Sequence, residues 1–101
     1  MKISPVLIEN CIYKVKKVYE NVVLGVKDSH GEEKICCVYT LKEEVDDNTA
    51  LETTLKKNVV SELGKNYSLD YLWKIDMIPR NINGKIDKNK LKQMWEKKND
   101  K

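Results

Sequence analysis

The 101-residue sequence has few of the residues from which metal, disulfide and phosphate sites are usually built. Its three cysteines, Cys11, Cys36 and Cys37, are odd in number, and none lies in a C-x-x-C pair, so they predict neither a disulfide framework nor a metal site. The one histidine, His30, stands in a polar Asp-Ser-His-Gly stretch that indicates a turn rather than a catalytic centre. The four glycines are scattered, so they cannot form a glycine-rich phosphate-binding loop.

Long apolar runs are also missing. No segment approaches the roughly 18–20 apolar residues of a membrane span, and the N-terminus lacks the apolar region of a signal peptide. Together with the unpaired cysteines, this predicts a cytoplasmic protein with no membrane partner. The length, with 41% hydrophobic and 35% charged residues, is typical of one compact domain and excludes a two-domain enzyme.

Arginine is nearly absent, and the basic charge is concentrated at one end. The net charge is +3, but residues 74–101 hold nine basic and four acidic residues, a net +5. Such an end attracts phosphate-bearing ligands or nucleic acid, or else it is a solvated lysine-rich tail, which we expect for residues 96–101 after a domain of residues 1–95. Arg80 is the only arginine, and because arginine is the usual reader of base edges, nucleic acid is not the expected partner.

The remaining sequence predicts helices alternating with short strands. Ser4-Pro5 is a helix-start signal, and it is followed by an apolar stripe at helical spacing: Ile8, Cys11, Ile12 and Val15. Two β-branched or alternating segments, residues 21–26 and 34–42, flank the turn at Gly31 and predict a β-hairpin.

A second helix is expected from a capping box, Thr49 to Glu52, to the C-cap Gly64. Alternation over residues 71–77 predicts a third strand, and Asp87 is the expected N-cap of a last helix. This order of elements predicts an α+β fold, a small three-stranded antiparallel sheet covered by helices.

One segment carries a specific signal, residues 78–91, with the sequence IPRNINGKIDKNKL. It resembles the C-terminal signature of the adenylate-forming enzymes, which include acyl- and aryl-CoA synthetases and the adenylation domains of nonribosomal peptide synthetases. The shared elements are a proline, a basic residue, a polar stretch, Asn-Gly-Lys, an aliphatic residue, an aspartate and a leucine four residues later. Residues 2–9, 22–28 and 36–41 resemble other parts of the same domain, so the resemblance covers about residues 2–93.

The resemblance implies the C-terminal lid domain of an AMP-dependent synthetase/ligase. Such enzymes use ATP and Mg to adenylate a carboxylate, and then form a thioester with CoA or a phosphopantetheine-bearing carrier protein. The implied catalytic residue is Lys85, whose ammonium would offset the repulsion between the carboxylate and the α-phosphate. Taken by itself, without the surrounding pattern, Lys85 would be interpreted as a solvated turn lysine.

Other positions take their roles from the same resemblance. Gly84 and Asn83 would shape the turn. Lys2 and Ile3 match the edge of a junction loop on the pantetheine side. Arg80 would contact the large domain or a phosphate, or be a plain surface cation. A further residue, Glu9, is expected to support local geometry rather than chemistry.

The large ATP-binding domain of these enzymes, with its phosphate loop and acyl pocket, is not in this sequence, and neither is the hinge residue that precedes the lid. We therefore expect a chain that is inactive without that large domain, which it would meet in cis or in trans. The chain would be either a separately encoded lid or a piece of a longer enzyme. The alternative is a non-enzymatic interaction or docking module that retains the lid fold. The acyl substrate is not encoded here.

Overall fold

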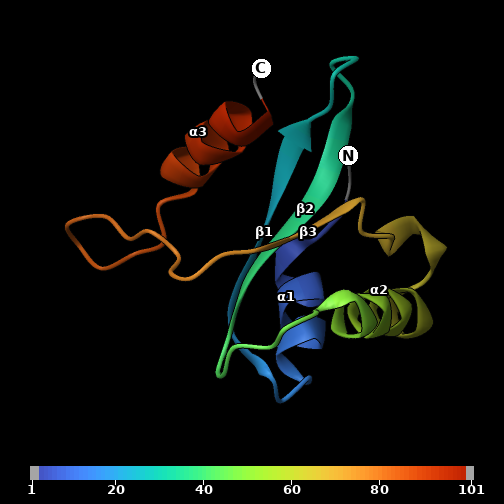
Figure 1. Cartoon of the computed structure of the whole chain (residues 1–101). Coiled ribbons are helices and arrows are strands. Elements are labelled where there is room, and N and C mark those ends of the chain that lie inside the picture. Colours follow the sequence, from blue (N-terminus) through green and yellow to red (C-terminus); the bar gives the residue numbers. More distant parts are fainter. Residues whose placement is uncertain (1–2, 100–101) are drawn as a thin grey trace.

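The structure, a computed structural model, describes residues 3–99 and has an α+β fold, as predicted (Figure 1). No helix within this range is both long and apolar enough to cross a membrane. The elements follow in this order: α1 (Pro5–Tyr13), β1 (Val18–Lys27), β2 (Glu33–Leu41), α2 (Thr49–Leu63), the 3-10 helix η1 (Lys65–Tyr67), β3 (Tyr71–Lys74) and α3 (Lys88–Asn99).

The sheet is mixed, so the predicted all-antiparallel sheet is wrong. Strands β1 and β2 form the expected antiparallel hairpin, but β3 lies parallel to β2 on its other side, from the pair Cys36–Tyr71 to the pair Tyr39–Lys74. Residues 42–70, which include α2, connect β2 to β3, and a helical crossover returns the chain to the end where β2 began. Asp70 fixes the start of β3, since its Oδ2 accepts a 2.8 Å hydrogen bond from the Ile35 backbone N–H.

Strand β3 is also shorter than the predicted 71–77. The Ile75 N–H still donates to the Tyr39 carbonyl at 3.0 Å, and then the chain leaves the sheet. Asp76 and Met77 are exposed, whereas Ile78 is buried again. The alternation of the sequence therefore continues for three residues after the strand itself has ended.

Helix α2 begins without the predicted capping box. Asn48 is the N-cap and Thr49 is already helical, while the Glu52 carboxylate accepts hydrogen bonds from the Tyr39 hydroxyl (2.5 Å) and from Asn48 Nδ2 (3.0 Å). Tyr39 is fully buried, so its hydroxyl needs a polar partner inside the protein. Glu52 serves that tyrosine instead of the helix terminus.

The other predicted helix ends are confirmed. The Ser4 hydroxyl accepts from the Leu7 N–H at 3.4 Å, with Pro5 at the first helical position. Gly64 ends α2 with a positive φ of 99°. Asp87 Oδ1 accepts from the Lys90 N–H at 3.0 Å, as an N-cap does at the start of α3.

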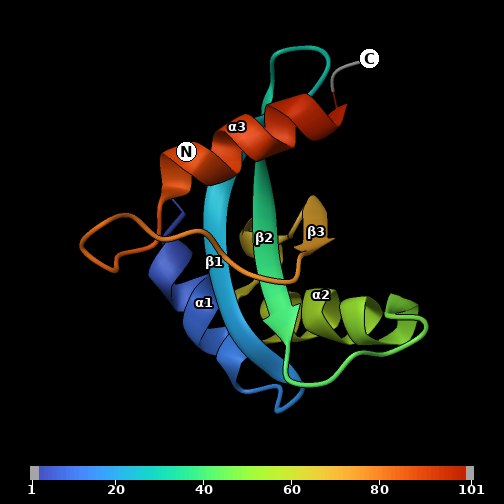
Figure 2. The same cartoon turned by 60° about the vertical axis from the view of Figure 1, so that its left-hand side comes forward.

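Both faces of the sheet are covered. Along β2, Ile35, Cys37 and Tyr39 belong to a core shared with α1 and α2, whereas Cys36 and Val38 belong to a second core shared with α3. Figure 2 shows α3 passing in front of β1 and β2, away from α1 and α2. The strand period of two thus separates two apolar layers.

Helix α3 is fastened to its face by aromatic contacts. The ring centroids of Trp95 and Tyr71 lie 4.9 Å apart, and those of Trp95 and Trp73 lie 5.6 Å apart. The Lys98 ammonium lies 5.2 Å from the Trp95 centroid. Helical structure continues to Asn99, so residues 96–99 belong to α3; the domain limits at residues 95 and 96 stay a prediction.

Shortening the apolar anchor of α3 is expected to destabilise the protein. Leu91 is fully buried, and Leu91→Ala should lower the free energy of unfolding by about 2–5 kcal/mol, the usual cost of a core cavity. The exposed neighbour Lys92 gives a matched control: Lys92→Ala should change the free energy of unfolding by less than about 0.5 kcal/mol. Urea denaturation of the three proteins measures the difference, and equal stabilities would contradict the assignment of α3 to the core.

Candidate functional site

The segment with the specific sequence signal forms a closed loop between β3 and α3, and we call residues 80–86 the lysine loop. Its ends pair as an isolated antiparallel bridge between Arg80 and Ile86. Inside the bridge, the Asn81 N–H donates to the Lys85 carbonyl at 2.8 Å, and the Gly84 N–H donates to the Asn81 carbonyl at 2.9 Å. The backbone of the lysine loop is therefore fixed by hydrogen bonds of its own.

Asn81 stabilises the turn from within. Its side-chain Oδ1 accepts from the Asn83 N–H at 2.9 Å and from the Lys85 N–H at 3.1 Å. The resemblance pointed to Asn83 and Gly84 as the residues that shape the turn, and this role of Asn81 was not predicted. The sequence does contain a signal for it: an asparagine at the start of a turn, whose side chain can accept a hydrogen bond from the N–H two residues later and so imitate a backbone turn.

Gly84 supplies the backbone conformation that the turn requires. Its φ is +82°, and within residues 3–99 only glycines adopt positive φ. Gly84 is in the left-handed region, whereas Asn83 is part of the turn without entering that region. A Cβ at position 84 would meet no atom within 4 Å, so the constraint is the dihedral angle and not the space.

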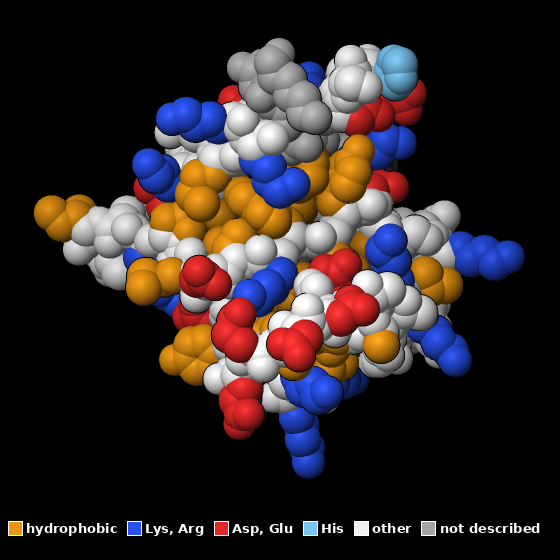
Figure 3. Space-filling model, viewed as in Figure 1, with side chains coloured by type: hydrophobic (Ala, Val, Ile, Leu, Met, Phe, Trp, Pro, Cys, Tyr) orange, Lys and Arg blue, Asp and Glu red, His pale blue; other side chains and the backbone are white. Residues whose placement is uncertain are grey.

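Lys85 lies on the exposed surface of this loop. Among the described residues, its ammonium has no hydrogen bond, ion pair or aromatic ring as a partner. The neighbouring Ile82 is 100% exposed, which is unusual for an aliphatic side chain. Figures 1 and 3 show the lysine loop projecting from the body of the protein to the left.

Arg80 is engaged within the chain. Its Nη1 donates to the Gly84 carbonyl at 3.0 Å, and its Nη2 forms a salt bridge with Glu20 Oε2 on β1. Arg80 is therefore a partly exposed cation that both contacts hold within this chain. The role of Glu20 gave no signal in the sequence, since 60 positions separate the partners.

The predicted N-terminal site residues lie elsewhere. Lys2 lies outside the described residues. Ile3 is half-buried and packs against the core shared by α1 and α2. Glu9, expected to support local geometry, does so: its Oε2 accepts from the Val23 N–H at 2.8 Å and ties α1 to β1.

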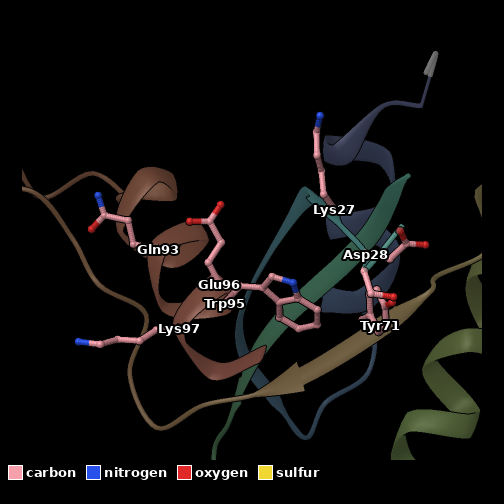
Figure 4. Close-up of a pocket in the computed structure, with 8 residues that line it drawn as sticks. Lys27, Asp28, Tyr71, Gln93, Trp95, Glu96 and Lys97 are labelled. Atoms are coloured by element: carbon pink, nitrogen blue, oxygen red, sulfur yellow. The ribbon is translucent and has the colours of Figure 1, made fainter. Parts of the chain in front are cut away.

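A hollow of about 820 Å³ lies between the turn of the β1–β2 hairpin and α3 (Figure 4). Its walls carry two lysines, Lys27 and Lys97, but also the carboxylates Asp28 and Glu96, so their charges balance. Trp95 forms its floor and is only 8% exposed. In Figure 4, Lys97 points away from the indole of Trp95.

The three cysteines are buried and reduced. Burial raises the pKa of Cys36 to about 12. Burial and a hydrogen bond to Glu62 raise the pKa of Cys11 to about 11, and burial also raises the pKa of Cys37. None is an activated nucleophile, and residues 3–99 contain no group of His, Cys, Asp and Glu that could hold a metal ion.

Comparison with known proteins identifies the family. Residues 7–85 match the family model described as the AMP-binding enzyme C-terminal domain. The chain belongs to this family. The resemblance found in the sequence is thereby confirmed: this is the AMP-binding C-terminal domain of adenylate-forming enzymes, which include acyl-CoA synthetases and adenylation domains of nonribosomal peptide synthetases.

Curated relatives of this AMP-binding C-terminal domain are far longer proteins. Gramicidin S synthase 2 of Brevibacillus brevis is 33% identical over 90 residues, which are 89% of this chain and 2% of that protein. Bacitracin synthase 1 of Bacillus licheniformis is 30% identical over the same lengths. The chain thus spans about 2% of the curated relatives that it matches.

Solved structures share the whole fold. An acyl-CoA synthetase of Brucella canis superposes with a TM-score of 0.82 at 23% identity, over 95% of this chain and 18% of that one. A benzoate CoA ligase of Burkholderia xenovorans LB400 gives 0.81 at 28% identity, over 90% of this chain and 18% of that one. In such full-length enzymes the AMP-binding C-terminal domain accompanies a large N-terminal adenylation domain.

The dihedral angle of Gly84 leads to a stability prediction for this domain. Gly84→Val should lower the free energy of unfolding by about 1–2 kcal/mol, because L-residues resist the left-handed region. Gly84→Asn should lower it by less, since asparagine tolerates that region. Thermal or urea unfolding compares the variants, and equal stability of Val and Asn at this position would refute the explanation.

Thiol reactivity tests the burial of the cysteines. At pH 8 the raised pKa values keep Cys11 and Cys36 protonated, so the folded protein should react with a chromogenic disulfide reagent at most slowly. All three cysteines should react rapidly in guanidinium chloride, which is the control for reagent and thiol content. A cysteine that reacts in the folded protein as fast as a small free thiol would show that the site is open.

Proposed function

We propose that this chain is the lid of an AMP-forming acid–thiol ligase and that Lys85 supplies the cation for carboxylate adenylation. In that step a carboxylate oxygen bonds to the α-phosphorus of ATP, and the bond from that phosphorus to pyrophosphate breaks. Two anions approach each other, and negative charge accumulates between them. A positioned ammonium offsets this repulsion, and it does so more strongly in a site closed to water.

The observation that carries the proposal is the contrast between the fixed backbone and the free side chain at Lys85. Its backbone N–H and carbonyl are both hydrogen-bonded within the lysine loop, whereas its ammonium is unpaired among the described residues and exposed. The ammonium therefore adds no ion pair or hydrogen bond to the stability of this domain. It is available to an anion bound on another domain.

The rest of the active site is proposed to lie on the large ATP-binding domain, reached in cis or in trans. The large domain would bind ATP with Mg and the acyl group, and this chain alone would be inactive. The acceptor would be CoA or a carrier-bound phosphopantetheine, since the chain resembles both peptide synthases and CoA ligases. For Lys2 and Ile3, a place beside the pantetheine stays part of the proposal. The free thiols favour a reducing, cytoplasmic location.

A domain exchange tests the proposal. This chain would replace the matching C-terminal segment of the Burkholderia benzoate CoA ligase, and benzoate-dependent ATP–pyrophosphate exchange would be measured. The rate of exchange should be higher for the chimera than for a ligase that is truncated before that segment. In the chimera, Lys85→Ala should lower exchange by roughly 10²–10³, the usual cost of removing one preorganised donor. Formation of the thioester from preformed benzoyl-AMP should change little.

Matched controls give the test its specificity. Lys88→Ala removes another exposed lysine, three residues away at the start of α3, and should leave exchange unchanged. The chain by itself should release no pyrophosphate. A chimera no more active than the truncated ligase would contradict the proposal, as would a Lys85→Ala chimera that exchanges at the parental rate.

A further inference from the structure

The side chain of Arg80 makes a polar contact between the lysine loop and the sheet, while Ile86 at the end of the loop packs against the core shared with α3. The guanidinium reaches the Gly84 carbonyl within the loop and the Glu20 carboxylate on β1 at the same time. We propose that Arg80 and Glu20 are positioning residues that set the direction in which Lys85 leaves the domain. This inference rests on the catalytic role proposed above for Lys85.

Inside the loop, Arg80 holds the peptide unit that leads into Lys85. The Gly84 carbonyl belongs to the peptide unit that immediately precedes the Lys85 Cα, and Arg80 Nη1 holds it at 3.0 Å. The N–H of the same peptide unit donates to Asn81 Oδ1, and the following peptide unit is held by the Asn81 N–H. Both peptide units that flank the Lys85 Cα are therefore fixed, so only the side-chain torsions of Lys85 remain free.

Outside the loop, Arg80 forms a salt bridge with Glu20 on β1. A loop can be internally rigid and still swing as a whole on the residues that lead into it. Ile82 is fully exposed, so apolar packing does not hold the tip of the loop against the body. The salt bridge from Arg80 to Glu20 connects the loop to β1, a ten-residue strand paired with β2 along its length.

Glu20 is suited to this task by its place on β1. The register of the hairpin shifts between Val18 and Glu20, and such an irregularity redirects a side chain relative to a regular strand. The Glu20 N–H donates to Thr40 Oγ1 at 3.1 Å, which fixes the backbone there. Its carboxylate is only 26% exposed, so the salt bridge is partly shielded from water.

An arginine at position 80 is suited to making both contacts at once. A planar guanidinium presents several N–H donors in fixed directions, so it can serve two acceptors at once. A lysine would bring one ammonium to the same place without this fixed geometry. Because a small misplacement of a catalytic group already slows a reaction severely, loss of the second contact should appear in the rate.

The first experiment uses the 101-residue chain alone and measures backbone order by 15N NMR. Glu20→Ala should lower the heteronuclear NOE values of residues 81–85 and leave those of α1 and α2 unchanged. Glu44→Ala is the matched control, because it removes the acidic partner of another exposed salt bridge, with Lys74, outside the loop. Unchanged order of the lysine loop in Glu20→Ala would overturn the proposal.

The second experiment measures adenylation in the ligase chimera described above. Glu20→Ala and Arg80→Lys should each lower kcat for exchange by about tenfold and leave the KM for ATP within about twofold. The thermal midpoint should move little, because salt bridges at the protein surface, even partly shielded ones, add little stability. The Glu44→Ala chimera should keep the parental kcat.

A double variant separates positioning from general damage. Adding Glu20→Ala to Lys85→Ala should cost nothing further, because there is no ammonium left to position. A further tenfold loss in the double variant would overturn the proposal, as would parental rates in both single variants while Lys85→Ala is impaired. If Lys85→Ala itself is harmless, the proposed function fails; the NMR result on the chain alone would still decide whether the salt bridge orders the loop.

Discussion

Burial of strand β2 on both faces is the constraint on which this structure depends. Four consecutive residues of the strand, Cys36 to Tyr39, are fully buried, so each face of the sheet must be covered by a separate layer. Helices α1 and α2 cover one face and α3 covers the other. The chain must therefore pass from β3 to the opposite layer before α3 begins, and the segment that makes this passage contains the lysine loop.

This origin explains the combination of properties found at the loop. The tip of this connection buries no apolar side chain, since Ile82 is fully exposed, so the conformation of the tip depends on hydrogen bonds. Asn81 and Gly84 supply the turn, and Arg80 supplies the tie to the sheet. Arg80, Asn81 and Asp87 of the sequence signature thus have structural roles within this domain, whereas the Lys85 ammonium has no partner among the described residues.

Local sequence signals predicted the parts of the fold that local interactions determine. The start of α1 at Ser4, the end of α2 at Gly64 and the cap at Asp87 are all side-chain or dihedral effects within a few residues. The parallel pairing of β3 could not be predicted in this way, because strand direction depends on the path of the whole crossover. The alternation in the sequence also continued beyond β3, where Met77 is exposed and Ile78 is buried in the core shared by the sheet and α3.

In the candidate site, too, the features set by neighbouring residues were predicted and those set by distant residues were not. The lysine and its glycine turn are recognisable from adjacent residues, so the sequence located them. The salt bridge from Arg80 to Glu20 joins a loop to a strand far away in the chain, and no local pattern announces it. At Glu52 the local pattern predicted a capping box that does not form, because the Glu52 carboxylate accepts a hydrogen bond from the distant, buried hydroxyl of Tyr39.

Helix α1 has one more effect, on the outer edge of β1. The outward backbone donors of two alternate residues are already satisfied, since the Asn21 N–H bonds to the Tyr13 hydroxyl at 3.2 Å and the Val23 N–H to Glu9. An exposed edge strand with unpaired donors invites a strand from another molecule to add to it and so begins aggregation. By occupying these donors, Tyr13 and Glu9 of α1 block the middle of that edge, and a small domain with two apolar layers gains protection against self-association there.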